Sequence, residues 1–397
     1  MKPLAGIRVL DLSRVMAGPY CASMLADAGA EVIKVEIPGI GEDARHFGPF
    51  AEGPNGRESA YFMMLNRGKR SITLDLKSPR GIDLLKRLAA KSDVLIENFR
   101  PGAAARLGIG YEALSAVNPR LVYASITGFG QTGPLAHRPA YDLVIQAMSG
   151  LMSVTGFPDG PPTAVGDSIC DVTTGMFAAW GITTALAGRA QTGRGQHLDV
   201  AMLDSMFSML LTVLAKRLYT GAEPGRVGNR HPVTYPVDCF RASDGHVVMV
   251  AISDAAFAKL MQAIGRPELA QDPRFRRNAD RSAHERELRA ILQDWMGART
   301  RDEIQAALDA VDVPCGPVWS IADVAASSHI EARGMILDPG HPALAAAPLV
   351  RQPVRFGSAA PETARAPALG EHTDAVLRGV LGLAPDEIDS LRRDRVI

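Results

Sequence analysis

The stretch from Ile7 to Glu36, IRVLDLSRVMAGPYCASMLADAGAEVIKVE, predicts a strand, a helix of small residues and a second strand. The runs at 7–12 and 31–36 have the length of strands and are rich in Val, Ile and Leu. The segment 19–29 between them is suited to a crossover helix. Because parallel strands need such a crossover, the stretch indicates a βαβ unit.

Strand and helix continue to alternate after this unit. Further strands are expected at 70–76, 93–98 and 121–126, with a helix around 82–88. Repeated βαβ units form a parallel sheet, and right-handed crossovers place helices on both of its faces. We therefore expect an α/β fold with a Rossmann-like large domain.

The pattern of predicted elements changes after this region. Helical segments continue to about residue 220, and the Gly-rich and charged segment 221–236 reads as a linker. A hairpin turning at Ser243-Asp244-Gly245 and charged helices at about 254–310 predict a smaller α+β domain over 237–325. The last part, 326–397, is rich in Pro and Ala and ends in a short helix.

Composition restricts the classes of function. The 43 basic and 43 acidic side chains cancel, which argues against a general nucleic-acid or anionic-membrane surface. The four cysteines contain no CxxC pair, and the nine histidines show no metal-ligand spacing, so we expect no metal site. The start of the chain lacks a signal-peptide core, and the apolar run 206–215 is too short for a bilayer. We therefore expect a cytoplasmic protein with no membrane partner.

The first strand-to-helix connection, Leu12 to Pro19, is not a dinucleotide fingerprint. It lacks G-x-G-x-x-G, although Glu36 ends the second strand where a ribose-binding acid would lie. Neither a P-loop nor HExxH is present. Nicotinamide or flavin binding is therefore disfavoured, and a Rossmann oxidoreductase with it.

Asp171 stands at the head of a helix whose next seventeen residues, Val172 to Gly188, carry no charge. A carboxylate at this place could cap the helix or act as a nucleophile. Spacing alone favours the cap. Asp167, four residues earlier, could form an acid–base pair with it, because neighbouring carboxylates split their pKa values.

A series of short motifs runs in order along nearly the whole chain and resembles the class III CoA-transferase family, which includes formyl-CoA transferase and carnitine CoA-transferase. The motifs occupy 4–11, 17–19, 32–36, 66–71, 97–102, 127–130, 140–142, 171–176, 192–196 and 369–373. The resemblance implies that 326–397 returns to the large domain. It also implies a ring-shaped subunit interlocked with its partner in a homodimer, with 221–236 and 325–350 as crossing segments.

The resemblance makes Asp171 the nucleophile. Its carboxylate would attack an acyl-CoA thioester to give an aspartyl anhydride, and then an aspartyl-CoA thioester that transfers CoA to a carboxylic acid. No metal or tightly bound cofactor is implied, and CoA is a substrate. With an ordinary pKa of about 3.9, the nucleophile would be ionised at neutral pH. Matching positions imply CoA contacts from Met16, Ala17, Leu65, Asn66, Arg67, Gly68, Asn98, Phe99, Arg100, Arg106 and the segment from Arg138 to Tyr141.

Two departures bear on the substrate. Met16 stands where formyl-CoA transferase has Gln, and Ala251 to Asp254 replace its glycine run. Both favour a succinyl or other dicarboxylyl donor over a strict formyl–oxalate pair. One alternative is an α-methylacyl-CoA racemase of the same fold, whose His-Asp pair falls at Tyr141-Asp142. Because Tyr is a poor base at neutral pH, transfer is favoured over racemisation. A non-catalytic CoA-binding protein is the other alternative.

Overall fold

The computed structural model describes residues 2–54, 56–357 and 364–397 and divides into two compact units. The first unit comprises the chain to Gly150, Val165–Met209 and Ser328–Ile397. The second comprises Leu151–Ala164 and Leu210–Ser327. Residues 151–164 and 210–220, placed in the large domain from the sequence, thus belong to the second unit. The C-terminal segment belongs to the first.

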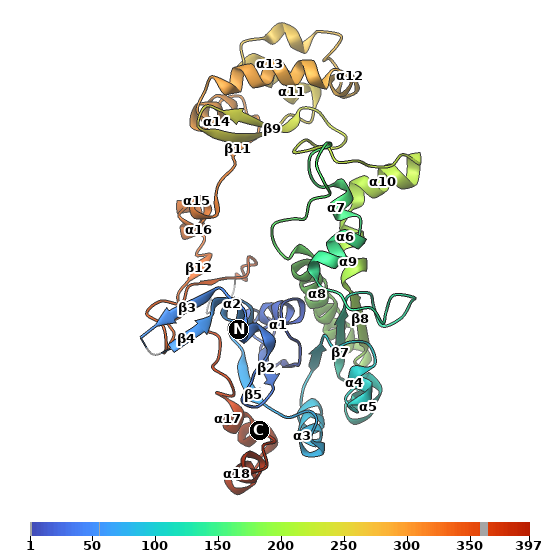
Figure 1. Ribbon diagram of the computed structural model, residues 1–397, viewed down its shortest axis with the longest axis vertical. Coiled ribbons are helices and arrows are strands. Elements are labelled where there is room, and N and C mark those ends of the chain that lie inside the picture. The colour runs from blue at the N-terminus through green and yellow to red at the C-terminus, as the bar shows by residue number, and fades with distance from the viewer. Residues whose placement is uncertain (1, 55, 358–363) are drawn as a thin grey trace. The chain divides into compact units, whose positions relative to one another are not determined.

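A six-stranded parallel sheet organises the first unit (Figure 1). Its order is β5-β2-β1-β6-β7-β8, which confirms the parallel sheet expected from the sequence. The strands are β1 (Arg8–Asp11), β2 (Glu31–Glu36), β5 (Arg70–Thr73), β6 (Val94–Glu97), β7 (Val122–Thr127) and β8 (His197–Ala201).

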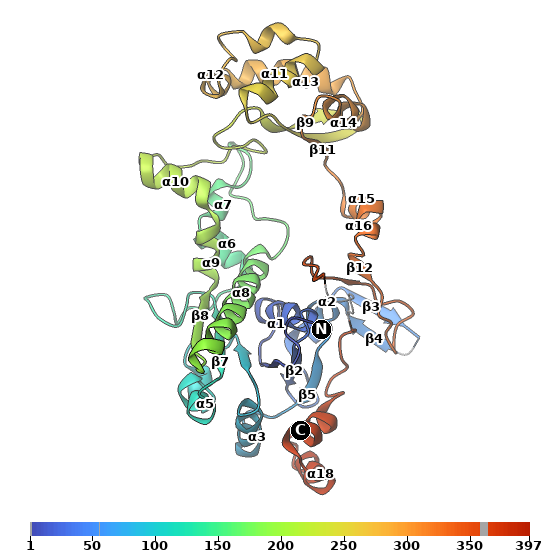
Figure 2. The same ribbon diagram turned by 180° about the vertical axis from the view of Figure 1, so that it is seen from behind.

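Helices cover both faces of this sheet, as the two opposite views show (Figures 1 and 2). On one face, α1 (Ala17–Asp27) and α8 (Ile169–Thr192) share a core with Val9, Val32 and Ile96. The other face packs Leu10, Ile33 and Leu95 mainly against four helices. Those helices are α3 (Pro79–Ala89), α5 (Tyr111–Val117), α17 (Thr373–Leu381) and α18 (Pro385–Arg393).

Smaller elements complete the first unit. Its remaining helices are η1 (Asp43–His46), α2 (Ala60–Asn66), α4 (Ala103–Arg106), α6 (Asp142–Met148), α9 (Met202–Met209) and α16 (Ser328–Ala332). Two short antiparallel ribbons pair β3 (Phe50–Gly53) with β4 (Gly56–Ser59), and β12 (Ile336–Leu337) with β13 (Leu349–Val350).

The strand order reverses direction between β1 and β6. The chain moves outward from β1 to β2 and β5, and then returns to the other side of β1 for β6. The loops that follow β1 and β6 therefore diverge from neighbouring strands at the carboxyl edge, where open α/β sheets bind ligands. Asn98 joins the two loops, because its side chain accepts from Arg14 N–H at 2.9 Å and donates to Arg14 C=O at 2.8 Å.

The long helix α8 approaches α1 very closely. Gly175 makes this possible, because a Cβ built there would lie 2.7 Å from the carbonyl oxygen of Ala17. By length and composition α8 could also cross a membrane. Its residues Ala178, Ile182 and Ala185, however, are buried in the core beneath the sheet.

The second unit has a core of its own. The antiparallel sheet β11-β10-β9 consists of β9 (Val237–Ala242), β10 (Gly245–Val250) and β11 (Cys315–Pro317). The pairing of β9 with β10 confirms the predicted hairpin. Phe240, Phe257 and Phe275 are fully buried in its core. Its helices are α7 (Leu151–Val154), α10 (Leu211–Thr220), α11 (Asp254–Ala263), η2 (Pro267–Ala270), α12 (Asn278–Ala283), α13 (Glu285–Gly297), α14 (Arg301–Asp309) and α15 (Ile321–Ala325).

Candidate active site

Asp171 lies in the first turn of α8 but does not cap it. The N-cap position belongs to Ser168, three residues earlier. The Asp171 carboxylate instead lies near the backbone N–H of Ala17, the first residue of α1, and that N–H lowers the pKa of Asp171. That N–H is one of the groups that a helix leaves unpaired at its N-terminus. The structure therefore holds the carboxylate at the positive end of a neighbouring helix.

Asp142, rather than Asp167, is the carboxylate coupled to Asp171. Its Oδ1 accepts from the backbone N–H of Cys170 at 2.7 Å and of Asp171 at 3.3 Å. Its Oδ2 accepts from Gln146 Nε2 at 2.6 Å. Asp167 is exposed and bonds the adjacent N–H of Ser168 at 2.7 Å. Asp142 thus takes the capping role that spacing suggested for Asp171.

The surroundings make Asp171 harder to ionise than a free aspartate. Burial and the nearby charge of Asp142 raise its pKa to about 7, although the Ala17 N–H opposes that rise. The expectation that Asp171 would be fully ionised at neutral pH therefore changes, since near pH 7 about half of it is protonated. A pKa near neutrality in a cavity is typical of a functional group.

A cavity of about 280 Å³ opens beside Asp171 at the carboxyl edge of the sheet. It brings together nine of the residues predicted to contact CoA. These are Met16, Ala17, Asn98, Phe99, Arg100, Arg138, Pro139, Ala140 and Tyr141. The predicted nucleophile and the loops after β1 and β6 thus face one space.

A second cavity of about 340 Å³ shares Arg14 and Phe99 with the first and extends along the ends of β2 and β5. Lys77 lines this second cavity, and Arg100 and Arg138 line the first. Among the described residues, the side chains of these four cations form no ion pair, whereas Arg67 and Arg45 do. The four are Arg14, Lys77, Arg100 and Arg138. Unpaired cations at a sheet edge are suited to phosphate groups.

The predicted contacts at 65–68 lie elsewhere. Leu65 and Asn66 are buried, and Asn66 Oδ1 accepts from Lys69 Nζ at 2.8 Å. The Arg67 guanidinium is paired with Asp27 at 2.7 Å. Gly68 N–H donates to backbone carbonyls of the C-terminal segment. This segment lines neither cavity, because its polar groups are used in packing, and we therefore leave it out of the site.

Arg106 also lines neither cavity. It is an exposed residue at the end of the short helix α4. Ala103 and Leu107 of the same stretch do line the second cavity. Arg106 is thus near the site, and its contact with CoA stays a prediction.

Tyr61 and Glu42 belong to the surroundings of the site although the sequence analysis did not select them. Burial raises the pKa of Tyr61, and the nearby charges of Asp171, Glu42, Asp167 and Asp142 raise it further. The Tyr61 phenol is therefore neutral and is close enough to these carboxylates to feel their charge. Nothing in the spacing of Tyr61, in an apolar helix, distinguishes it from a core residue.

Comparison with known proteins identifies the family. The model of CoA-transferase family III matches residues 4–373. The chain belongs to this family. Its membership confirms the resemblance seen in the ordered motifs, and it makes the protein an enzyme of the class III CoA-transferases.

Two relatives and one solved structure show how close the match is. The chain is 45% identical to acetyl-CoA:oxalate CoA-transferase of Acetobacter aceti, covering 85% of this chain and 86% of that protein. It is 41% identical to succinate–glutarate CoA-transferase of Agrobacterium fabrum, covering 94% of this chain and 95% of that protein. A CaiB/BaiF family structure from Brucella suis is 42% identical with a TM-score of 0.84, covering 95% of this chain and 99% of that one.

Proposed function

We propose that Asp171 is the nucleophile through which this class III CoA-transferase moves CoA between carboxylic acids. The observation that carries the proposal is the position of its carboxylate, which lines a cavity together with Ala17, whose free N–H lies near it. The N–H orients the carboxylate through one of its oxygens, and the other oxygen remains free to attack a thioester carbonyl.

The reaction proceeds through three covalent species, an anhydride with the donor acid, an aspartyl-CoA thioester and an anhydride with the acceptor acid. One Asp171 oxygen attacks the donor thioester, the C–S bond breaks, and an anhydride and CoA thiolate form. The thiolate then attacks the Asp171 carbonyl carbon and expels the donor acid, leaving an aspartyl-CoA thioester. The acceptor carboxylate displaces the thiolate from this thioester, and the thiolate takes the acceptor acyl group and frees Asp171. The cycle needs no net proton transfer.

The N–H of Ala17 has a chemical role in this cycle. When the thiolate attacks the Asp171 carbonyl, negative charge develops on the carbonyl oxygen. A backbone N–H fixed at a helix N-terminus stabilises such an oxyanion without reorganising. Removing one donor of this kind typically costs about 10²–10³ in kcat. The position of Ala17 is therefore central to the rate.

The two cavities suggest how CoA lies in the site. The thioester must reach Asp171 in the first cavity, and the unpaired cations Arg14, Arg100 and Lys77 are suited to the phosphate groups. Arg14 and Phe99 line both cavities, so an extended ligand passing them would occupy both. We place the nucleotide end of CoA along β2 and β5.

We further propose a dicarboxylic acid as one of the two carboxylic substrates. Relatives are named for oxalate, succinate and glutarate. Arg138 lines the cavity that contains Asp171 and could hold a second carboxylate. A panel of acyl-CoA donors against mono- and dicarboxylic acids, read by mass spectrometry, tests this choice.

A homodimer is proposed from the apolar surface that each chain leaves exposed. On α8, Met176 and Trp180 are 50% and 67% exposed, and Leu143 and Phe207 of neighbouring helices are 59% and 50% exposed. Large exposed apolar patches usually mark an interface. We propose that a second copy covers them in the interlocked arrangement, which would give a dimer that does not dissociate into folded monomers. Sedimentation across a dilution series tests this arrangement.

The covalent chemistry has a direct test. Incubation with a suitable acyl-CoA should give a hydroxylamine-sensitive adduct on the peptide that contains Asp171, and Asp171→Asn should abolish transfer while retaining CoA binding. CoA binding without any adduct would support a non-catalytic role. Hydrogen exchange at the α-carbon of a 2-methylacyl-CoA, without transfer, would support the racemase alternative.

A further inference from the structure

The loop that enters α1 is fixed at nearly every backbone position. Asp11 Oδ1 accepts Ser13 N–H at 3.0 Å, and the buried Lys34 donates to Ser13 C=O at 3.0 Å. Arg14 is bonded at both backbone groups by Asn98. Asp11, Lys34 and Asn98 thus hold a loop of a few residues that leads directly to Ala17, which lines the same cavity as Asp171.

Val15, in the middle of this loop, has a strained backbone. Its φ is 67°, in the left-handed region that a β-branched residue rarely adopts. Such a conformation persists only where the surrounding structure imposes it. The restraint on Val15 itself is a hydrogen bond from its N–H to Glu42 Oε2 at 3.0 Å, and the same oxygen accepts Ala44 N–H at 2.9 Å.

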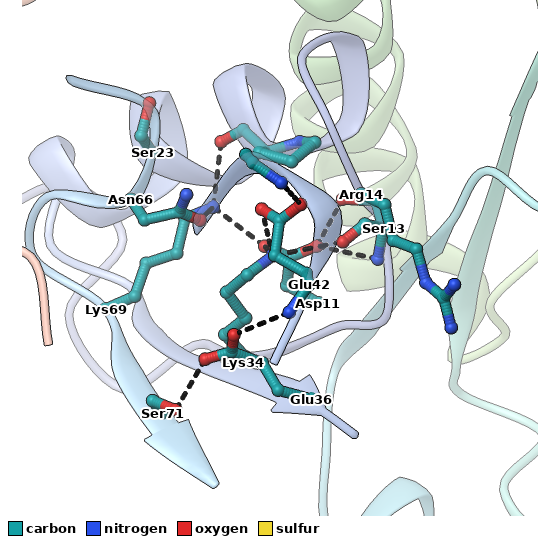
Figure 3. Close-up of polar contacts among 12 residues, drawn as sticks. Asp11, Ser13, Arg14, Ser23, Lys34, Glu36, Glu42, Asn66, Lys69 and Ser71 are labelled. Atoms are coloured by element: carbon teal, nitrogen blue, oxygen red, sulfur yellow. Dashed lines mark hydrogen bonds and ion pairs between the residues drawn. The ribbon is translucent and has the colours of Figure 1, made fainter. Parts of the chain in front are cut away.

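Glu42 is in turn held by a buried group of charges (Figure 3). Lys34 Nζ lies 3.3 Å from Glu42 Oε1, an oxygen with no hydrogen bond among the described residues. Lys34 also lies 3.8 Å from Asp11 Oδ2, which accepts from Lys69 Nζ at 2.7 Å. Asp11, Lys34, Lys69 and Glu42 are each at most 3% exposed. We call these four residues the buried charge network.

A network of this kind is costly to bury. Ions taken from water lose solvation that their mutual attraction only partly restores, and apolar residues of similar size are often at least as stabilising. A role in general stability therefore explains it poorly. Its two cations and two anions converge on the loop carrying the strained Val15, directly before Ala17, which lines the cavity beside Asp171.

We infer that the buried charge network, acting through Glu42, is a positioning device that forces Val15 into its left-handed conformation and so aims the Ala17 N–H at Asp171. Glu42 and Val15 are positioning residues here, because they act on the reacting carboxylate only through Ala17. The inference rests on the proposed function, since its readout is transfer through Asp171.

A double-mutant cycle separates this role from simple structural support. In Glu42→Ala the restraint on Val15 is lost, the loop relaxes, and kcat should fall about 10- to 100-fold, the loss typical of a misplaced donor. KM for acyl-CoA should change much less. Glycine adopts positive φ without strain, so the double variant Glu42→Ala with Val15→Gly should have a kcat about tenfold higher than Glu42→Ala alone. Val15→Gly alone, which removes a side chain lining the cavity, should cost a few-fold.

The pH profile gives a second readout. Loss of the Ala17 N–H raises the pKa of Asp171, which would move the acid limb of kcat/KM to higher pH in Glu42→Ala and back in the double variant. The groups that face Asp171 are Asp142, Cys170 and Tyr61. Removing the Glu42 charge alone would move the limb to lower pH, so the direction of the shift distinguishes the two effects.

The control is another buried ion pair on the same helix. Asp27, at the far end of α1, pairs with Arg67 at 2.7 Å, and both side chains are at most 6% exposed. Asp27→Ala should lower the melting temperature and leave kcat unchanged. If Glu42→Ala does not fold, Glu42→Met, which has a side chain of similar length but no acceptor oxygen for Val15 N–H, replaces it throughout the cycle.

The outcomes are distinct. A wild-type enzyme that forms no adduct on Asp171 contradicts the proposed function. With a working wild type, two results overturn the positioning role. One is a double variant in which the kcat losses of Glu42→Ala and Val15→Gly simply add. The other is a kcat loss in Asp27→Ala equal to that in Glu42→Ala. Rescue of kcat together with return of the pH limb supports it.

Discussion

Gly175→Ala should reduce catalysis by pushing α8 away from α1. The added Cβ would lie 2.7 Å from the Ala17 carbonyl oxygen and 3.3 Å from Cys21 N. The first distance is about 0.7 Å short of an ordinary van der Waals separation of 3.4 Å, and the opposing atom is backbone that cannot rotate away. The helices must therefore separate close to the place where the Ala17 N–H lies near Asp171, which is one turn earlier on α8.

The expected size of the effect follows from this overlap. Overpacking costs about 1–3 kcal/mol, and the better helix propensity of alanine offsets about 1 kcal/mol of it. Stability should therefore fall by no more than about 2 kcal/mol. A misplacement near 1 Å can cost about 10²-fold in rate, so a shift of several tenths of an ångström should lower kcat about 10- to 100-fold.

The assay compares kcat, CoA binding and thermal unfolding with those of Gly188→Ala. Gly188 is in the same helix, and among the described residues no atom outside its own helix and its chain neighbours lies within 4 Å of a Cβ built there. Gly188→Ala should gain up to about 1 kcal/mol and keep its kcat. Wild-type kcat in a stable Gly175→Ala enzyme would refute the reasoning, because α8 would then not need this close approach.

Three further predictions concern charge. The acid limb of kcat/KM should lie near pH 7, where Asp171 ionises, and Asp142→Asn should move it to lower pH by removing the repelling charge, as a pH–rate profile would show. Because burial raises the folded pKa of Asp171 above its unfolded value, its contribution to stability falls as pH rises from about 4 to about 7. Asp171→Asn should therefore be more stable than wild type at pH 8, by at most about 4 kcal/mol, and not at pH 4, as denaturant unfolding at both pH values would show. Arg14→Ala and Lys77→Ala should each raise KM for acyl-CoA about tenfold with little change in kcat, whereas Arg67→Ala should lower stability and leave KM unchanged, as steady-state kinetics would show. An unmoved acid limb, equal stabilities at pH 8, or a raised KM in Arg67→Ala would contradict the respective assignments.

Most of the first unit could be predicted because its strands are buried on both faces. The strands at 7–12 and 31–36 are rich in Val, Ile and Leu with a few charged residues between them, and such runs are recognisable in a sequence. β8 was missed as a strand, since His197 and Asp199 are exposed and the edge strand carries only a weak pattern. The division into units was harder, because residues 151–164 fold with a segment that begins almost fifty positions later.

The site could be predicted only where sequence neighbours also act together. Asp171 was found because an uncharged helix follows it and because its motif fits the family. Its partner Asp142 lies 29 residues earlier, and only the fold brings the two carboxylates together, whereas the nearby Asp167 turns out to be exposed. The resemblance implied CoA contacts at 65–68, but the arginine of this segment is paired with Asp27, a partner that spacing does not reveal.

The most direct test of the central claim follows oxygen through one catalytic cycle. When the acceptor carboxylate attacks the aspartyl-CoA thioester, one of its oxygens becomes the bridge of the new anhydride and remains on Asp171 after the acyl group leaves. Turnover with an acceptor acid labelled with ¹⁸O should therefore deposit the label in the peptide that contains Asp171, as mass spectrometry would show. Continued turnover with no label on Asp171, or with label on another residue, would contradict the account.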